Sequence, residues 1–181
     1  MRLIILDRDG VINEDSDEYV KSVDEWRPIP GSIDAISRLS KNDYRVVVAT
    51  NQSGIARGYY SVETLMAMHD KMHQLVNDAG GAIEAVFFCP HGPDDACECR
   101  KPLPGMYVDI GKRLRVDLKD IPVIGDSLRD LQAAEKVEAR PILVRTGKGE
   151  RTLEKLGDGA KSMEVYKDLA AAVDALLIED E

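Results

Sequence analysis

The stretch RLIILDRDG, residues 2–10, decides the fold class. Its apolar, β-branched part is short and ends abruptly in charge, which is typical of a strand buried on both faces of a parallel sheet. Asp7 and Asp9 follow this strand, two residues apart. Ligand crevices in open α/β sheets lie outside the carboxyl ends of the strands. We therefore expect both carboxylates at such a crevice.

The rest of the chain alternates short apolar runs with amphipathic stretches. Ser32, Ser61 and Ser127 are helix-capping residue types that stand before amphipathic stretches. The strands predicted after the first are residues 45–49, 83–88, 123–125 and 142–144, and further predicted helices are residues 106–114 and 169–178. This alternation predicts an α/β fold, a single Rossmann-like domain over residues 1–181 with a parallel sheet flanked by helices. The interval between the first two strands is too short for a large cap domain.

The composition is that of a globular protein with an acidic surface. Of 181 residues, 24 are Lys or Arg and 33 are Asp or Glu, which gives a formal net charge of −9. Such a body is a poor electrostatic match for nucleic acid or an anionic membrane. No apolar run approaches the roughly 20 residues that span a bilayer, and the initial run is too short for a signal peptide. We expect a cytoplasmic protein, and a monomer because the sequence has no heptad pattern or large apolar stripe.

Polar residues at the ends of the other strands complete a candidate site. Thr50 follows the second strand, Lys101 follows the loop after the third, and Asp126 follows the fourth with Asp130 one turn later. One Asp at a strand end is commonly a turn or cap residue, but this combination is far more specific. Three carboxylates in one crevice repel each other and need a cation, and hard oxygen ligands suit Mg²⁺.

A magnesium site of this kind suits phosphate chemistry. The metal and Lys101 can neutralise a phosphoryl group that the net charge would otherwise repel. One carboxylate can attack phosphorus and form an aspartyl-phosphate. A second carboxylate, two residues away, can serve as general acid and then as general base, which is worth roughly 10²–10⁴-fold in rate.

The three cysteines cluster with a histidine in one loop. Cys89, His91, Cys97 and Cys99 have the pattern C-x-H-x₅-C-x-C. Three thiolates and one imidazole complete a tetrahedral zinc shell with no open position, which predicts a structural Zn²⁺ site. The zinc-binding loop, residues 89–101, would then position Arg100 and Lys101 at the crevice.

The motifs together resemble those of the haloacid dehalogenase (HAD) superfamily of phosphotransferases over about residues 2–150. The four motifs are matched by DRDG (7–10), TN (50–51), Lys101 and GDSLRD (125–130). The resemblance implies an HAD-like fold with Asp7 as nucleophile and Asp9 as acid/base. It also implies that Thr50 and Lys101 hold the phosphoryl group. The implied Mg²⁺ ligands are Asp7, the backbone carbonyl of Asp9, and Asp126, with Asp130 in support.

Within the superfamily, the zinc loop and the CRKP stretch (99–102) resemble the group that holds the D-glycero-D-manno-heptose-1,7-bisphosphate 7-phosphatases and the histidinol-phosphate phosphatases. The chain as a whole is more similar to the heptose enzymes, which implies hydrolysis of a 7-phosphate in the synthesis of ADP-heptose and lipopolysaccharide core precursors. The five residues between His91 and Cys97 are typical of the histidinol enzymes, so that activity is the alternative. The resemblance implies these substrate contacts: Arg8, Asp15, Tyr19, Asn51, Gln52, Ser53, Arg100 and Ser127.

Other interpretations carry less weight. A phosphoacceptor signalling domain would have an acceptor Asp after a central strand, where this chain has Ala49-Thr50-Asn51. His69 and His73 stand four residues apart and are interpreted as part of a surface helix rather than a chelating pair. The sequence Gly147-Lys148-Gly149 is interpreted as an ordinary loop.

Overall fold

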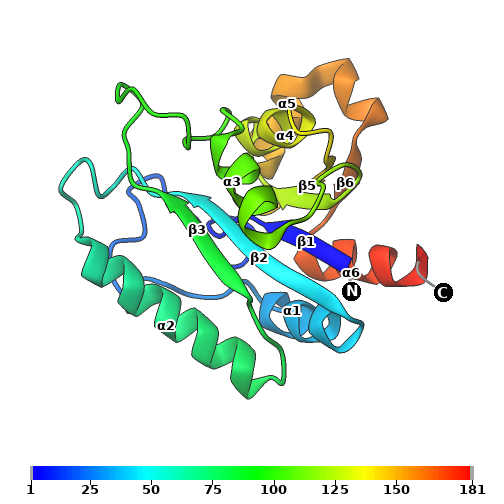
Figure 1. The fold of residues 1–181 in the computed structure, drawn as a ribbon, viewed down its shortest axis with the longest axis horizontal. Helices are drawn as coiled ribbons and strands as arrows, with labels where there is room; N and C mark the ends of the chain where they lie inside the picture. The colour runs from blue at the N-terminus through cyan, green and yellow to red at the C-terminus, as the bar shows by residue number, and fades with distance from the viewer. Residues whose placement is uncertain (1, 180–181) are drawn as a thin grey trace.

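The computed structural model describes residues 2–179 and contains a six-stranded sheet (Figure 1). The strand order is β3-β2-β1-β4-β5-β6, and every neighbouring pair is parallel. The strands are β1 (Arg2–Leu6), β2 (Tyr44–Asn51), β3 (Ala85–Cys89), β4 (Pro122–Gly125), β5 (Arg140–Val144) and β6 (Glu164–Tyr166). The predicted α/β architecture is confirmed, although the sequence predicted only the first five of these strands.

Helices cover both faces of the sheet. They are α1 (Ser32–Lys41), α2 (Val62–Asp78), α3 (Gly105–Leu114), α4 (Leu128–Glu135), α5 (Gly149–Leu156), the 3₁₀ helix η1 (Gly157–Ser162) and α6 (Leu169–Glu179). Helices α1, α2 and α6 share one core with the sheet, and α3 and α4 share the other. Over residues 2–179, no helix has the length and apolar character needed to cross a membrane.

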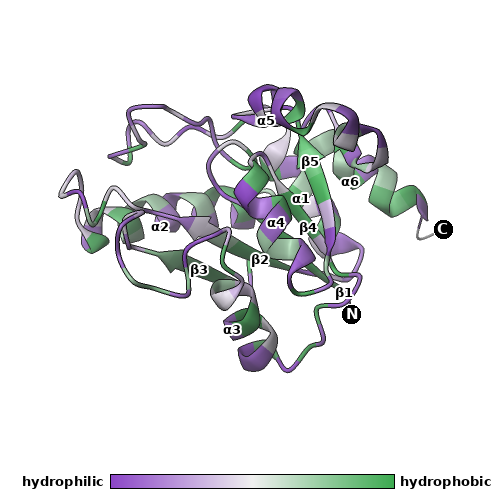
Figure 2. Cartoon of the chain, turned by 90° about the horizontal axis from the view of Figure 1, so that it is seen from above, coloured by the Kyte–Doolittle hydropathy of each residue, from purple (hydrophilic) through white to green (hydrophobic). Residues whose placement is uncertain are grey.

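The two cores follow from the alternation of side chains along the strands. In β1, Ile4 and Leu6 face the core under α1, α2 and α6, whereas Leu3 and Ile5 face the core under α3 and α4. All four side chains are buried because β1 lies inside the sheet. Figure 2 shows the result as apolar strands between helices whose outer faces are polar.

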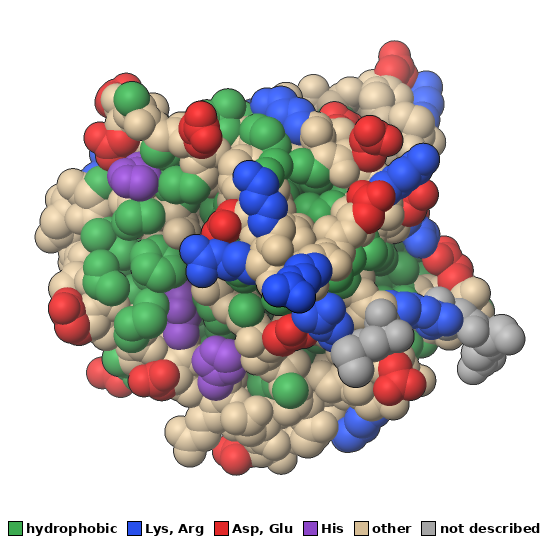
Figure 3. Space-filling model, in the orientation of Figure 1, with side chains coloured by type: hydrophobic (Ala, Val, Ile, Leu, Met, Phe, Trp, Pro, Cys, Tyr) green, Lys and Arg blue, Asp and Glu red, His purple; other side chains and the backbone are tan. Residues whose placement is uncertain are grey.

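At one edge of the sheet, β3 is only partly covered. Phe87 and Phe88 are half-buried, one on each core. On the face seen in Figure 3, hydrophobic side chains gather in the region between β3 and α2.

Two helix starts differ in how they are capped. The Ser61 hydroxyl accepts a hydrogen bond from the Thr64 N–H, so the predicted cap of α2 is confirmed. The predicted Ser32 cap of α1 is wrong. Gly31 caps that helix in the left-handed conformation, and the Ser32 hydroxyl instead donates to the Ile12 carbonyl at 2.7 Å. This bond ties α1 to the loop that follows β1.

Candidate active site

The carboxyl ends of the strands open into a cleft of about 280 Å³. The loops after β1, β2 and β3 meet there, as the topology requires. The predicted residues that line the cleft are Asp7, Asp9, Asp15, Tyr19, Thr50, Asn51, Gln52, Ser53, Arg100, Lys101, Asp126 and Ser127.

Asp7 and Lys101 form the centre of the cleft floor. The Lys101 ammonium lies 3.1 Å from Asp7 Oδ1 and donates to the Ala49 carbonyl at 2.8 Å. Burial raises the pKa of Asp7 to about 7, with the Asp130 carboxylate adding to the effect and Lys101 opposing it. Burial alone would lower the pKa of Lys101, but Asp130 and Asp7 hold it well above its usual value. Lys101 is therefore a fixed cation beside Asp7.

Asp126 lies between two glycines. A Cβ on Gly10 would stand 2.1 Å from Asp126 Oδ2, and a Cβ on Gly147 would stand 2.2 Å from the same atom. Both glycines have positive φ, at +82° and +57°, which other residues adopt only with strain. Asp126 Oδ2 also accepts the Lys148 N–H at 2.7 Å. Burial, together with Asp130 and Asp7, raises the pKa of Asp126 to about 8.

Asp130 is occupied by bonds within the protein. Its Oδ1 lies 2.5 Å from the Lys101 ammonium, and its Oδ2 accepts the N–H and the hydroxyl of Ser127. The bond from the Ser127 N–H is part of the capping box that starts α4, in which the Ser127 side chain accepts the Asp130 N–H in return. The arrangement agrees with the supporting role expected for Asp130.

The acidic cluster fits a divalent cation. Oxygens of Asp7, Asp126 and Asp130 lie within 4.8 Å of one another. Asp130 raises the pKa of both Asp7 and Asp126, and Asp7 also raises that of Asp126, so additional positive charge would stabilise the ionised cluster. Both oxygens of Asp130 are bonded within the protein, whereas the bonds described for Asp7 go to Oδ1 and that for Asp126 goes to Oδ2. Asp7 and Asp126 are therefore the side chains that fit best as Mg²⁺ ligands.

Asp9 is held by a dense set of donors. It accepts hydrogen bonds from the Arg8 guanidinium at 2.8 and 3.0 Å, from Asn13 Nδ2 at 2.8 Å and from Gln52 Nε2 at 2.8 Å. Burial alone would raise the pKa of Asp9, but the Arg8 charge and these hydrogen bonds lower it below its usual value. Asp9 is thus ionised and fixed in one orientation in the free protein.

The structure corrects the prediction that Arg8 contacts substrate. Its side chain is fully buried and lies outside the cleft lining. A cation can be buried there because Asp9 neutralises it.

Asn51 and Gln52, at the end of β2, line the cleft, but their side-chain amides are hydrogen-bonded within the protein. Asn51 donates to the Lys101 carbonyl at 3.0 Å and accepts the Lys101 N–H at 3.1 Å. Gln52 Nε2 donates to both Asp9 and Thr50 Oγ1, and its Oε1 accepts the Tyr60 hydroxyl. Their side chains therefore position Lys101 and Asp9, which the sequence did not indicate.

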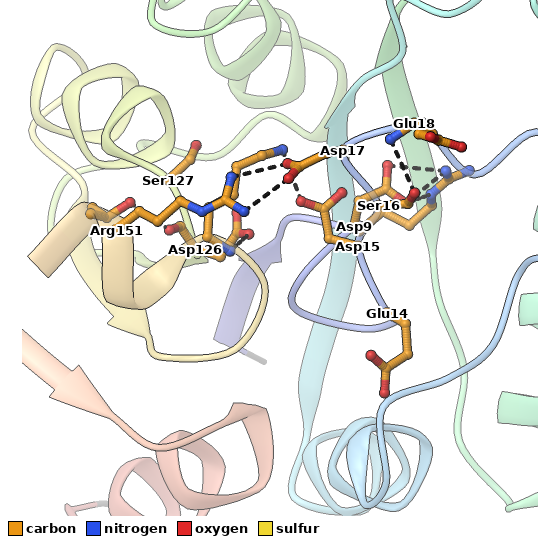
Figure 4. A network of polar contacts seen from close by, with 12 residues as sticks. Asp9, Glu14, Asp15, Ser16, Asp17, Glu18, Asp126, Ser127 and Arg151 are labelled. Atoms are coloured by element: carbon orange, nitrogen blue, oxygen red, sulfur yellow. Dashed lines mark hydrogen bonds and ion pairs between the residues drawn. The ribbon is translucent and has the colours of Figure 1, made fainter.

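The loop after β1 is fastened across the cleft. Asp15 Oδ2 lies 2.8 Å from the Lys148 ammonium. Asp17 pairs with Arg151 of α5 at 2.9 Å, and Figure 4 shows this pair bridging from the loop to the helix beside Asp126. Tyr19, at φ +69°, packs edge-on against Tyr59 with ring centroids 5.1 Å apart.

Cys89, His91, Cys97 and Cys99 come together as predicted, with ligand atoms within 4.8 Å of one another. His91 Nδ1 lies 3.2 Å from Cys99 Sγ and 3.5 Å from Cys89 Sγ. These separations suit four ligands around one ion with Zn–S and Zn–N distances of about 2.3 and 2.0 Å. Burial raises the pKa of the Cys89 thiol, so a cation is needed to hold it as thiolate. Arg100 Nη1 donates to the His91 carbonyl at 3.2 Å, which ties the cluster to the cleft.

Several cleft residues escaped the sequence prediction. Arg57, Tyr60, Arg129 and Lys148 all line it. The glycine pair around Lys148 was the one available signal, and it was interpreted as an ordinary loop. Burial and the Arg129 charge both lower the pKa of Arg100.

Comparison with known proteins adds independent findings. The HAD-hydrolase-like family model matches residues 98–172. The chain is 57% identical over 179 residues, 99% of both chains, to the D-glycero-beta-D-manno-heptose-1,7-bisphosphate 7-phosphatase of Bordetella bronchiseptica. It is 56% identical to the enzyme of that name from Pseudomonas aeruginosa, over 97% of both chains.

Solved structures agree. A crystal structure of D,D-heptose 1,7-bisphosphate phosphatase from B. bronchiseptica, complexed with magnesium and phosphate, is similar with a TM-score of 0.95 and 57% identity over 99% of both chains. The D,D-heptose 1,7-bisphosphate phosphatase from Burkholderia thailandensis is similar with a TM-score of 0.77 and 46% identity, over 98% of this chain and 99% of that one.

Proposed function

Because the chain belongs to the family of D-glycero-beta-D-manno-heptose-1,7-bisphosphate 7-phosphatases, we propose that it is a Mg²⁺-dependent phosphomonoesterase that removes the 7-phosphate of this heptose bisphosphate. The observation that carries the proposal is identity of 57% over 99% of the chain, together with a cleft that gathers the four predicted motifs. The product, a heptose 1-phosphate, serves the synthesis of ADP-heptose and lipopolysaccharide core precursors.

The metal-binding residues in this proposal are Asp7, Asp126 and the backbone carbonyl of Asp9. Bound Mg²⁺ supplies positive charge that offsets the phosphoryl oxygens and the carboxylates. Thr50 and Lys101 hold the transferring phosphoryl group, with Asn51 fixing the Lys101 backbone.

In the first half-reaction an Asp7 oxygen attacks phosphorus and the ester P–O bond breaks. The leaving C7 oxygen takes a proton from Asp9, so that an alcohol departs and an aspartyl-phosphate remains on Asp7. Asp9 is ionised in the free protein, and the approach of an anionic ester raises its proton affinity. The proton therefore enters Asp9 with the substrate.

In the second half-reaction Asp9, now a carboxylate, takes a proton from water. The water oxygen attacks phosphorus, the Asp7–phosphorus bond breaks, and inorganic phosphate leaves. Asp9 is ionised in the free protein, which is the state that this basic role requires.

The remaining predicted contacts bind the rest of the substrate. Arg100 holds the distal phosphate, because a guanidinium makes bidentate contacts with phosphate. Asp15, Tyr19, Ser53 and Ser127 line the sugar site together with Asn51 and Gln52. The zinc-binding loop, residues 89–101, keeps Arg100 and Lys101 at the cleft. Residues 1–181 act as one phosphatase domain, and we propose a cytoplasmic monomer that binds neither nucleic acid nor membrane.

The alternative, a histidinol-phosphate phosphatase, rests on the short zinc-loop spacing alone. The relatives favour the heptose substrate despite that spacing.

The site of hydrolysis can be tested by ³¹P NMR with the heptose 1,7-bisphosphate and Mg²⁺. We expect the 7-phosphate resonance to give way to inorganic phosphate while the anomeric phosphate resonance persists. Loss of the anomeric phosphate first, or no reaction, would contradict the proposal.

A further inference from the structure

Two buried residues, Arg8 and His69, lie outside the cleft lining, with Arg8 next to Asp9 and His69 next to Arg8. The Arg8 guanidinium donates through Nη2 to both oxygens of Asp9 and through Nε to Oδ1. On its other side, Arg8 Nη1 lies 3.3 Å from His69 Nε2. The guanidinium is therefore held between a carboxylate and an imidazole.

His69 comes from the middle of α2, far from β1 in the sequence. His69 is 4% exposed, so the prediction that it lies on the surface of its helix is wrong. The ring packs edge-on toward Phe88 of β3, with centroids 6.4 Å apart. Burial, and then the Arg8 charge, lower the pKa of His69 to about 3. The imidazole is thus neutral, and its Nε2 has a lone pair for the Arg8 N–H.

The alternatives for His69 are less well supported. Chelation with His73 through Nε2 would compete with the Arg8 guanidinium, which this atom faces. A purely space-filling role needs no hydrogen-bond acceptor, and the buried Nη1 of Arg8 would then lose this acceptor.

We propose that His69 is a positioning residue for the acid/base Asp9 and acts through Arg8. A guanidinium held on one side only can rotate about its side-chain bonds, and Asp9 would move with it. Acceptance by His69 fixes the guanidinium plane and hence the Asp9 carboxylate. The inference rests on the proposed function for the role of Asp9. It assigns a residue of α2 to the set of side chains that position the acid/base group.

The position of Asp9 matters most when the leaving oxygen needs a proton. A sugar alkoxide needs one, whereas the phenolate released from p-nitrophenyl phosphate is stable without it. Water attack on the phosphoenzyme needs Asp9 as base with either substrate. A misplaced Asp9 should therefore slow both half-reactions with the sugar phosphate but only the second with the aryl phosphate.

The experiment compares His69→Leu, His69→Gln and the matched control His73→Leu with the wild type. Gln can offer an acceptor oxygen to Arg8, and His73, half-buried one turn later, provides the same change on the same helix. For His69→Leu on the heptose bisphosphate we expect kcat to fall by about 10- to 100-fold with KM changed by less than about threefold. For His69→Gln we expect a smaller fall in kcat, so that the logarithm of kcat recovers at least about half of the difference between His69→Leu and the wild type. The kcat and KM of His73→Leu should match those of the wild type.

Rapid mixing with p-nitrophenyl phosphate gives the discriminating readout. His69→Leu should release close to one p-nitrophenolate per active site in a fast burst, followed by slow turnover. Melting curves establish whether each variant is folded. If His69→Leu is not folded, the same measurements are made on His69→Gln and His69→Met, of which only the first offers an acceptor oxygen to Arg8.

The positioning role would be overturned if His69→Leu slowed the p-nitrophenolate burst as much as the steady-state turnover. It would also be overturned if the variant changed mainly KM for the sugar phosphate rather than kcat. A His73→Leu variant that behaves like His69→Leu would overturn it as well. If the wild type leaves the heptose bisphosphate intact but hydrolyses another alkyl phosphomonoester, the proposed substrate fails. The His69 comparison can then be made on that ester and still decides the inference.

Discussion

Asp7 combines the features that a nucleophilic carboxylate needs. Its side chain is 13% exposed, so it reaches the cleft while most of it is shielded from water. Oδ1 is fixed by the Arg8 N–H at 2.8 Å and by the Lys101 ammonium at 3.1 Å. With Oδ1 held by these two donors, Oδ2 is the oxygen that can meet phosphorus.

The variant Asp7→Asn should lose turnover and keep the fold. An amide has the same shape but is a very poor nucleophile, so we expect at least about a 10³-fold fall in kcat, with an unchanged circular dichroism spectrum. Phosphate release measured with Mg²⁺ present checks this, and residual activity within tenfold of the wild type would refute the assignment.

We propose that Arg100 serves substrate binding rather than the chemical step. It donates to the His91 carbonyl and lines the cleft, and the proposed function assigns it to the distal phosphate. For Arg100→Ala we expect kcat/KM for the bisphosphate to fall by about 10²-fold, while kcat/KM for a monophosphate ester changes by less than about threefold. Steady-state kinetics on the two substrates decide it, and an equal loss on both would exclude a contact with the second phosphate.

At the scale of single residues, the sequence predicted many of the side chains that line the cleft but not the contacts that hold them in place. Asp7, Asp9 and Asp126 follow directly from strand ends in a parallel sheet. The burial of Arg8 could not be predicted, because a charged residue at a strand end is normally solvated. Its partners Asp9 and His69 surround it only once α2 has packed on the sheet.

The zinc-binding loop is the element that connects the sheet to the cleft. Cys89 ends β3, and the loop reaches Lys101 shortly before α3 begins at Gly105. The Gly105 N–H donates to the Glu98 carbonyl at 3.0 Å, which closes the loop onto its helix. Metal binding at the four ligands should therefore order the chain that carries Arg100 and Lys101.

Protein purified without chelator should hold about one zinc ion per chain. For Cys97→Ser we expect zinc content to fall and Tm to drop by at least about 5 °C, because a structural zinc contributes directly to folding free energy. Metal analysis and thermal melting check this, with the exposed loop residue Asp94→Ala as control. A zinc content far below one in the wild type would contradict the assignment.

The elements were predicted best where hydrophobic patterns are strong. The runs of β1, β2, β4 and β5 are continuous and apolar, and their strands were identified to within a few residues. The run of β6, Glu164–Tyr166, is three residues long and partly polar, so it gains strand identity only by pairing with β5. Helix α5 begins at Gly149, at the end of the stretch Gly147-Lys148-Gly149, which was interpreted as a loop from the sequence.

On the scale of the whole molecule, the acidic chain, with its formal net charge of −9, gathers three carboxylates at one site, those of Asp7, Asp126 and Asp130. Asp7 and Asp130 pair with the Lys101 ammonium, and Asp126 accepts the Lys148 N–H. Burial and neighbouring carboxylates raise the pKa of Asp7 and of Asp126, so the folded, metal-free protein resists ionising these two groups, whereas the unfolded chain ionises them freely.

This imbalance predicts a pH-dependent stability. The pKa of Asp126 is raised from 3.8 to about 8 in the fold, so its ionisation destabilises the folded state increasingly as pH rises from about 4 to about 8. In Mg²⁺-free buffer, the Tm of Asp126→Asn relative to the wild type should increase by at least about 3 °C between pH 5 and pH 8. Adding Mg²⁺ at pH 8 should raise the Tm of the wild type and leave that of the variant nearly unchanged. If the difference in Tm between Asp126→Asn and the wild type did not change with pH, ionisation of Asp126 would not destabilise the folded state, which would contradict the prediction.

The most direct test of the central claim is kcat/KM for heptose 1,7-bisphosphate and for histidinol phosphate, measured side by side with Mg²⁺ and with Asp7→Asn as background. We predict a preference for the bisphosphate of at least about 10²-fold, since only that substrate presents a second phosphate to Arg100. A preference for histidinol phosphate would contradict the proposed substrate and assign the same catalytic residues to histidine biosynthesis.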